Sequence, residues 1–160
     1  MIIAFKRNDK SSVMGQMVSL AQKLNGESGY EYKHCEILFP ETGEAIAART
    51  EEGVKVRPIS QIIKNPAVWD FYEVPADDEK ARNWLLEQLD AEYNYGAVLG
   101  WYALGLALTP ENVFYCSELV YIVLRDFAQL PIDRTLNPAR ITPAYLRQLL
   151  VKAGAKPIQP

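Results

Sequence analysis

The sequence predicts a single α+β domain in which a central antiparallel sheet packs against helices. Short segments rich in β-branched and aromatic residues alternate with turn residues in the first half of the chain. The second half carries apolar and amphipathic segments that begin after helix-capping residues. A chain of 160 residues can bury one sizeable core, and no repeat, low-complexity run or linker divides residues 1–160.

The expected strands follow from alternating or β-branched runs bounded by glycine, proline and acidic turn residues. They cover residues 2–5, 33–39, 44–49, 54–58 and 68–74. The second and third of these form a hairpin around a Pro40–Gly43 turn. A brief helical turn is expected over 60–64, and the tail over 157–160 is expected to fray.

The expected helices follow from apolar residues at helical spacing and from their caps. They cover residues 13–24, 77–89, 97–108, 116–128 and 143–153. The last begins with Thr142 as cap and Pro143 at its first position. The helix over 116–128 is apolar almost all round, which indicates a core helix.

The segment over 97–108 is uncharged and apolar, but it is much shorter than the roughly 20 residues that a membrane-spanning helix needs. We therefore expect no transmembrane segment and interpret it as a buried helix. Peripheral contact with a membrane surface or an acyl chain is the alternative.

Charge and composition exclude several classes of function. The net charge is −3 and no cluster of Lys and Arg exceeds two residues, so we expect no nucleic-acid partner. The N-terminus lacks the charge order and apolar length of a signal peptide, which predicts a cytoplasmic protein, with export by another route left open. Cys35 and Cys116 could form one disulfide, but two cysteines are no disulfide framework.

His34 is the only histidine, so any imidazole chemistry depends on it. No metal site is expected, because period two along the strand places Cys35 on the face opposite to His34, and one His with two Cys makes no tetrahedral set. No cofactor is expected either, since the glycines form no phosphate-binding loop. No Gly-x-Ser-x-Gly elbow exists for a serine hydrolase.

Cys116 opens the predicted core helix, where the helix dipole and unpaired backbone N–H groups favour a thiolate. A nucleophilic thiol needs an imidazole to take its proton and return it to the leaving group, and His34 is the one candidate. The backbone N–H of Cys116 would also lie near a developing oxyanion. The alternative is that Cys116 only fills core space and His34 is a strand histidine.

Two motifs carry a resemblance to a known family. The runs Tyr-Asn-Tyr-Gly at 93–96 and Tyr-Cys-Ser-Glu-Leu-Val at 115–120 resemble the motifs of NlpC-like cysteine hydrolases, which have a papain-like fold and act on peptide or amide bonds, often in cell walls. Because the histidine precedes the cysteine, the chain resembles the circularly permuted branch, which includes YaeF/YiiX-like bacterial proteins and the lecithin-retinol acyltransferase group. Further matches at 52–54 and 142–146 extend the resemblance over residues 30 to 150.

The resemblance implies a permuted papain-like fold with the nucleophile at a helix N-terminus. It makes Cys116 the nucleophile and His34 the general base and acid. Tyr93 matches the family tyrosine near the thiol, whose hydroxyl could donate to the oxyanion or the substrate. Tyr95 and Tyr115, from the same motifs, join it as candidate substrate or oxyanion contacts.

The chain departs from the family at the third catalytic member. The family places a polar residue about a dozen positions after the histidine, where this chain has the apolar residues 46–48. Glu36 shares a strand face with His34 and is the substitute candidate for orienting the imidazole. Glu44 and Arg49 are weaker candidates.

The sequence interpretation is therefore a cysteine peptidase or amidase that acts through a thioester acyl-enzyme, with a peptide or amide substrate that could come from cell walls. One alternative keeps the Cys–His pair and makes the chain a lipid acyltransferase or thioesterase, because the segment over 97–108 could line an acyl-chain site. The other is a catalytically inactive binding module, favoured by the apolar residues 46–48.

Overall fold

The chain folds into an α+β domain, and the computed structural model describes residues 1–8, 13–28, 30–95 and 112–159. The strands are β1 (Ile2–Arg7), β2 (Tyr32–Phe39), β3 (Glu44–Arg49), β4 (Gly53–Pro58), β5 (Trp69–Glu73), β6 (Glu92–Tyr93), β7 (Val113–Phe114) and β8 (Lys156–Ile158). The helices are α1 (Val13–Leu24), α2 (Ile59–Ile62), α3 (Asp78–Glu87), α5 (Cys116–Phe127) and α6 (Pro143–Lys152), with the 3-10 turns η1 (Pro66–Val68) and η2 (Pro138–Arg140).

Six strands form one antiparallel sheet in the order β4-β3-β2-β1-β5-β8. The predicted hairpin of β2 and β3 is confirmed, as are the predicted strands at β1, β4 and β5. The strands β6 and β7 pair with each other in parallel outside this sheet. The predicted α+β class and central antiparallel sheet are therefore confirmed.

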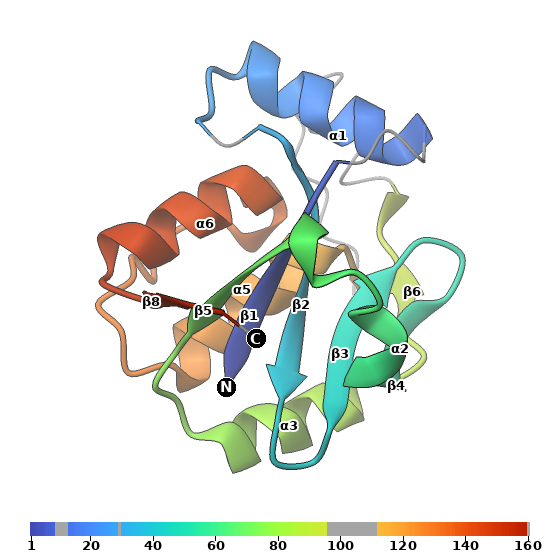
Figure 1. The fold of residues 1–160 in the computed structure, drawn as a ribbon, viewed down its shortest axis with the longest axis vertical. Coiled ribbons are helices and arrows are strands. Elements are labelled where there is room, and N and C mark those ends of the chain that lie inside the picture. The colour runs from blue at the N-terminus through green and yellow to red at the C-terminus, as the bar shows by residue number, and fades with distance from the viewer. Residues whose placement is uncertain (9–12, 29, 96–111, 160) are drawn as a thin grey trace.

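The two faces of the sheet are covered unequally. One face packs against α3, α5 and α6 and holds the larger core, in which Phe5, Ile37 and Leu119 are fully buried. Figure 1 shows α5 behind the sheet with α6 beside it. The other face carries a smaller apolar cluster around Leu38 and Phe71, against which residues of α2 and η1 pack. Charged and polar side chains of the sheet, such as His34 and Glu36, share this second face with Leu38.

Helix α5 is the buried helix that its apolar pattern predicts. Eight of its side chains are buried, from Cys116 through Tyr121 and at Val123 and Leu124. The Glu118 carboxylate accepts a hydrogen bond from the Tyr115 backbone N–H at 3.3 Å, which satisfies one donor of the first turn. The helix contacts both β2 and β3.

The hydrogen-bonded ladder between β2 and β3 covers only the part of each strand next to their turn. It pairs Phe39 with Glu44 at the turn and ends where Ile37 faces Ile46. Beyond that point β2 continues to Tyr32 along β1, and β3 continues to Arg49 along β4. The two strands therefore leave the first residues of β2 and the last residues of β3 without mutual pairing.

One expectation about the end of the chain is wrong. The tail over 157–160 does not fray throughout, because Pro157 and Ile158 belong to β8 and pair with β5. Helix α1 forms as predicted, but Val13, Met17 and Leu24 of its apolar side are exposed. The side that packs inward instead holds the buried Gln22, which donates hydrogen bonds to the carbonyls of Tyr30 and Tyr32. The predicted helix over 97–108 lies outside the described residues.

A glycine at the start of β4 holds β6 close to the sheet. Gly53 has φ = +68°, and a Cβ built on it would lie 2.2 Å from the carbonyl oxygen of Ala91. The Val54 N–H donates to that same carbonyl at 2.9 Å. The close approach brings the β6 residue Tyr93 beside the end of β3.

We predict that Gly53→Ala destabilises the fold far more than Gly43→Ala. Both glycines have positive φ, but no atom lies within 4 Å of the Cβ position at Gly43. Gly43→Ala should lower the free energy of unfolding by about 1 kcal/mol through backbone strain alone. Gly53→Ala should lower it by at least about 2 kcal/mol more, because backbone must move. Urea unfolding of both variants measures the difference, and equal losses would contradict the close approach.

Candidate active site

The thiol of Cys116 lies at the start of α5, against residues from both strands where their ladder has ended. Cys116 is the first helical residue after Tyr115 and is 3% exposed. Its side chain interacts with Cys35 and His34 of β2, and it has an electrostatic interaction with Arg49 of β3. The two cysteines are both free thiols.

The surroundings of Cys116 favour its thiolate in spite of burial. The pKa of Cys116 is well below the usual value, chiefly because the Cys35 side chain hydrogen-bonds to it. The charge of His34 and a hydrogen bond with its imidazole lower this pKa further, as does the backbone of Cys35, while burial opposes them. A thiolate at this position can act as a nucleophile at neutral pH.

Cys35 complements Cys116 as a protonated partner. Burial raises the pKa of the fully buried Cys35 thiol well above its usual value, and the hydrogen bond and charge of Cys116 raise it further. The Cys35 thiol therefore keeps its proton and donates a hydrogen bond to the Cys116 sulfur. The sequence pattern placed Cys35 on the sheet face opposite to His34 but did not predict this contact with Cys116. The signal was present, because Cys35 faces the same core that the helix beginning at Cys116 enters.

His34 is held from its other side by a buried carboxylate. His34 Nε2 lies 3.1 Å from Oε1 of Glu36, which is 1% exposed. The Arg49 guanidinium pairs with the same oxygen across the gap between β2 and β3. Burial and, to a smaller extent, the charge of Arg57 lower the pKa of Arg49 to about 10. Because this value is still well above 7, Arg49 is positively charged at neutral pH. The structure thus brings the substitute candidate Glu36 to His34.

The three candidate tyrosines occupy different places. Tyr93 lines a cavity together with His34. The Tyr95 hydroxyl accepts a hydrogen bond from the Glu51 N–H at 2.8 Å, and its ring lies against Tyr93 at 5.0 Å between centroids. The Tyr115 hydroxyl donates to the Ile141 carbonyl at 2.7 Å, which ties it to η2. Only Tyr93 is therefore placed to meet a molecule beside His34.

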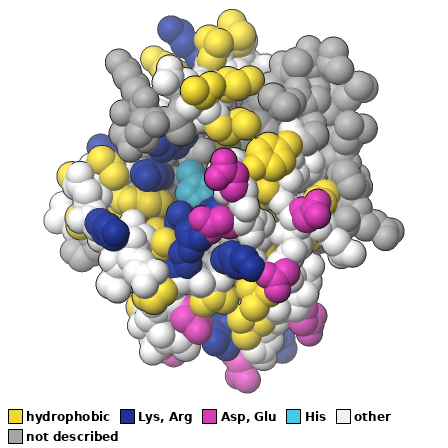
Figure 2. All heavy atoms as spheres, turned by 90° about the vertical axis from the view of Figure 1, so that its right-hand side faces the viewer, with side chains coloured by type: hydrophobic (Ala, Val, Ile, Leu, Met, Phe, Trp, Pro, Cys, Tyr) yellow, Lys and Arg dark blue, Asp and Glu magenta, His cyan; other side chains and the backbone are white. Residues whose placement is uncertain are grey.

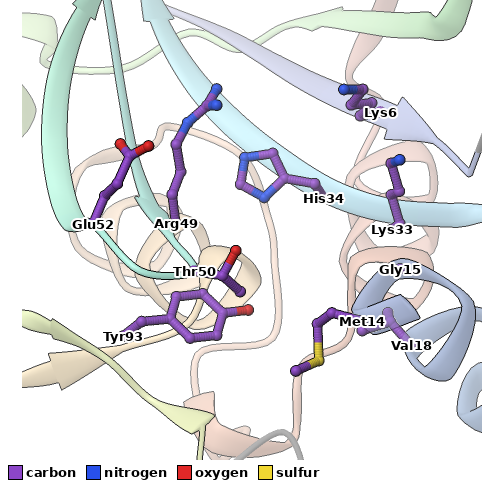
Figure 3. A pocket seen from close by; sticks show the side chains of 10 residues that line it. All are labelled: Lys6, Met14, Gly15, Val18, Lys33, His34, Arg49, Thr50, Glu52 and Tyr93. Carbon is purple, nitrogen blue, oxygen red and sulfur yellow. The ribbon is translucent and has the colours of Figure 1, made fainter. Parts of the chain in front are cut away.

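The cavity beside His34 has a volume of about 290 Å³. Met14 and Val18 of α1 form one wall, and Thr50 lies opposite with Tyr93. Figure 3 shows the imidazole projecting between these walls, and Figure 2 shows it reaching the molecular surface. Cys116 is not among the described lining residues of this cavity.

Glu118 is a buried carboxyl two residues after Cys116, in the first turn of α5. It is 4% exposed, and burial raises its pKa to about 7. Hydrogen bonds from the Tyr115 N–H and the Asn94 side chain hold the pKa from rising further. The carboxyl therefore changes its charge near neutral pH within the first turn of α5.

Other kinds of site find no support in the described ranges. No three His, Cys, Asp or Glu side chains among the residues that the structure describes are grouped to hold a metal ion. No helix among them is long and apolar enough to cross a membrane. Comparison of the chain with protein-family models, curated proteins and solved structures finds no match.

We predict that the Cys35 thiol sets the ionisation of Cys116. Cys35→Ala removes the hydrogen-bond donor and should raise the midpoint of the pH profile for alkylation of Cys116 by iodoacetamide. Cys35→Ser keeps a hydroxyl donor and should preserve part of the shift. Peptide mass analysis verifies that Cys116 carries the label. A midpoint that is the same in wild type and in Cys35→Ala would contradict the contact.

We also predict that Glu118 makes stability depend on pH. Its pKa is raised on folding from 4.5 to about 7, so the folded state holds the proton more tightly. Its stabilising contribution is complete below about pH 4.5 and is lost as the pH rises through about 7, a change of about 3 kcal/mol. Glu118→Gln should remove this slope in denaturant unfolding measured from pH 5 to 8. Parallel curves for wild type and variant would show that Glu118 titrates normally.

Proposed function

We propose that the chain is a cysteine hydrolase that cleaves amide or peptide bonds through a thioester acyl-enzyme at Cys116. The observation that carries the proposal is the lowered pKa of Cys116 at the start of α5, in hydrogen-bond contact with His34. The proposal includes the permuted papain-like fold of NlpC-like hydrolases, which the Tyr-Cys-Ser-Glu-Leu-Val run and the order of His34 and Cys116 resemble. Cell-wall peptides as substrate and a cytoplasmic location belong to it as well.

The reaction follows from the charges around the thiol. The Cys116 sulfur attacks the substrate carbonyl, and the oxyanion forms near the backbone N–H of Cys116 at the helix N-terminus. The protonated His34 gives its proton to the leaving amine as the C–N bond breaks. His34 then takes a proton from water, the resulting hydroxide attacks the thioester, and the thiolate leaves as the free acid forms.

Glu36 acts through His34 in this scheme. Its carboxylate holds Nε2, which leaves Nδ1 as the nitrogen that exchanges protons with the thiol and the substrate. The ion pair with Arg49 keeps the buried carboxylate charged and fixed in place. Glu36 is thus a positioning residue, in the place that the apolar residues 46–48 cannot fill.

A second candidate function is acyl transfer from a lipid. Helix α1 exposes Val13, Met17, Leu20 and Leu24, which recur at helical spacing. The same helix supplies Met14 to the wall of the cavity at His34. An apolar helix side next to the cavity fits the approach of a membrane or a fatty-acyl chain.

We predict that a panel of peptide amides, peptidoglycan fragments and fatty-acyl thioesters traps a covalent acyl adduct on Cys116, detected by intact mass. Cys116→Ala and His34→Ala should both abolish the adduct while changing the melting temperature little. Glu36→Gln should lower kcat by about tenfold or more with a smaller effect on KM, because triad members contribute unequally.

The acyl group that is retained decides between the two functions. Peptidyl adducts favour the hydrolase, and adducts from fatty-acyl donors together with flotation on liposomes favour the lipid enzyme. A panel that leaves folded Cys116 unmodified, with no alkylation by iodoacetamide at neutral pH, would leave an inactive binding module as the function.

A further inference from the structure

A second cavity adjoins the first and shares three of its lining residues. It has a volume of about 740 Å³ and lies on the sheet face that α2 and η1 cover. Lys6, His34 and Arg49 line both cavities. Figure 3 shows His34 between the Arg49 guanidinium and the Lys6 ammonium. A molecule that contacts His34 can therefore extend into either cavity.

The wall of the second cavity is strongly cationic. Lys6, Arg49, Arg57 and Lys64 line it, and no aspartate or glutamate is among its described lining residues. This gathering stands out in a chain whose net charge is −3. Figure 2 shows basic side chains on one side of the imidazole.

Carboxylates outside this wall hold the two guanidinium groups in place. Arg49 pairs with Glu36, and Arg57 pairs with Glu52. Arg57 keeps a quarter of its side chain exposed, and Lys64 is exposed. Lys64 forms no ion pair with a described residue. The arginines are thereby pre-positioned, and Lys64 adds an exposed positive charge.

Such a wall favours a specific ligand chemistry. A hollow lined by one sign of charge focuses the field and concentrates ions of the opposite sign. Arginine recognises planar carboxylate and tetrahedral phosphate oxygens with two parallel donors. Trp69 lines the same cavity, and the Lys6 ammonium lies 5.7 Å from its ring centroid. The lining of this cavity therefore combines an aromatic ring with basic side chains.

We propose that the second cavity is an anion subsite that binds a carboxylate or phosphate group of the substrate. The role of this group as part of a substrate rests on the proposed function, because the scissile carbonyl then lies at Cys116 and His34. The substrate class narrows to acyl or peptide compounds that carry an anionic group on the side of the scissile bond facing α2.

Binding is tested without catalysis through the sole histidine. Titration of the Cys116→Ala protein with succinate and, separately, with inorganic phosphate is followed by the NMR signal of the His34 ring. A bound anion should shift this signal in a saturable way and raise the pKa of the imidazole. Stronger binding of succinate identifies a carboxylate group, and stronger binding of phosphate identifies a phosphate group.

Charge variants decide whether the cavity itself is responsible. Lys64→Gln should weaken anion binding by about threefold, and the double variant Lys64→Gln/Arg57→Gln by about tenfold, which are ordinary values for exposed charges. Lys152→Gln makes the same charge change at an exposed position on α6, away from α2, and should leave binding unaltered. Absence of a saturable shift, or equal weakening by Lys152→Gln, would overturn the proposal.

The two proposals fail separately. Alkylation of wild-type Cys116 is compared for iodoacetate and iodoacetamide, with glutathione as the reference thiol. A ratio of iodoacetate to iodoacetamide rates above that of glutathione, falling in Lys64→Gln and with added salt, supports the subsite. Normal reaction with iodoacetamide and a ratio equal to that of glutathione speaks against the subsite and leaves the nucleophile in place. Saturable anion binding without an acyl adduct keeps the subsite and removes the hydrolase.

Discussion

The site depends on the early end of the ladder between β2 and β3. Paired backbone would close the sheet at His34 and Arg49, as it does between β3 and β4 down to Arg49 and Gly53. Because pairing stops at Ile37 and Ile46, the start of α5 meets side chains of both strands there. The gap lets a thiol on a core helix interact with an imidazole whose neighbours line the opposite, open face of the sheet.

A short series of charged and hydrogen-bonded contacts crosses this gap. Arg49 pairs with Glu36, Glu36 holds His34, and His34 stabilises the thiolate of Cys116. A buried carboxylate with no partner would cost several kcal/mol, so the position of Arg49 is a condition for the position of Glu36. The Cys35 thiol completes the set from the core side. Without Arg49, the buried Glu36 carboxylate would keep only the His34 imidazole as a partner.

The proposed anion subsite follows from the same arrangement. The arginines that pair with Glu36 and Glu52 also line the second cavity, where the proposal has their positive charge attract a ligand. His34 lines both cavities and lies between the proposed reacting centre and the proposed subsite. In the two proposals, recognition and chemistry share one stretch of sheet surface, at the start of β2 and the end of β3.

The sequence by itself determined the α+β class, the hairpin of β2 and β3, the core helix at Cys116 and the candidates Cys116, His34 and Glu36, because these depend on local periodicity, caps and residue type. Only the tertiary structure decided the rest. The place where a ladder ends, the contact of Cys35 with Cys116, the pairing of Arg49 with Glu36 and the cationic cavity all join residues far apart in the chain. Their positions follow from long-range packing and charge, which no local pattern encodes.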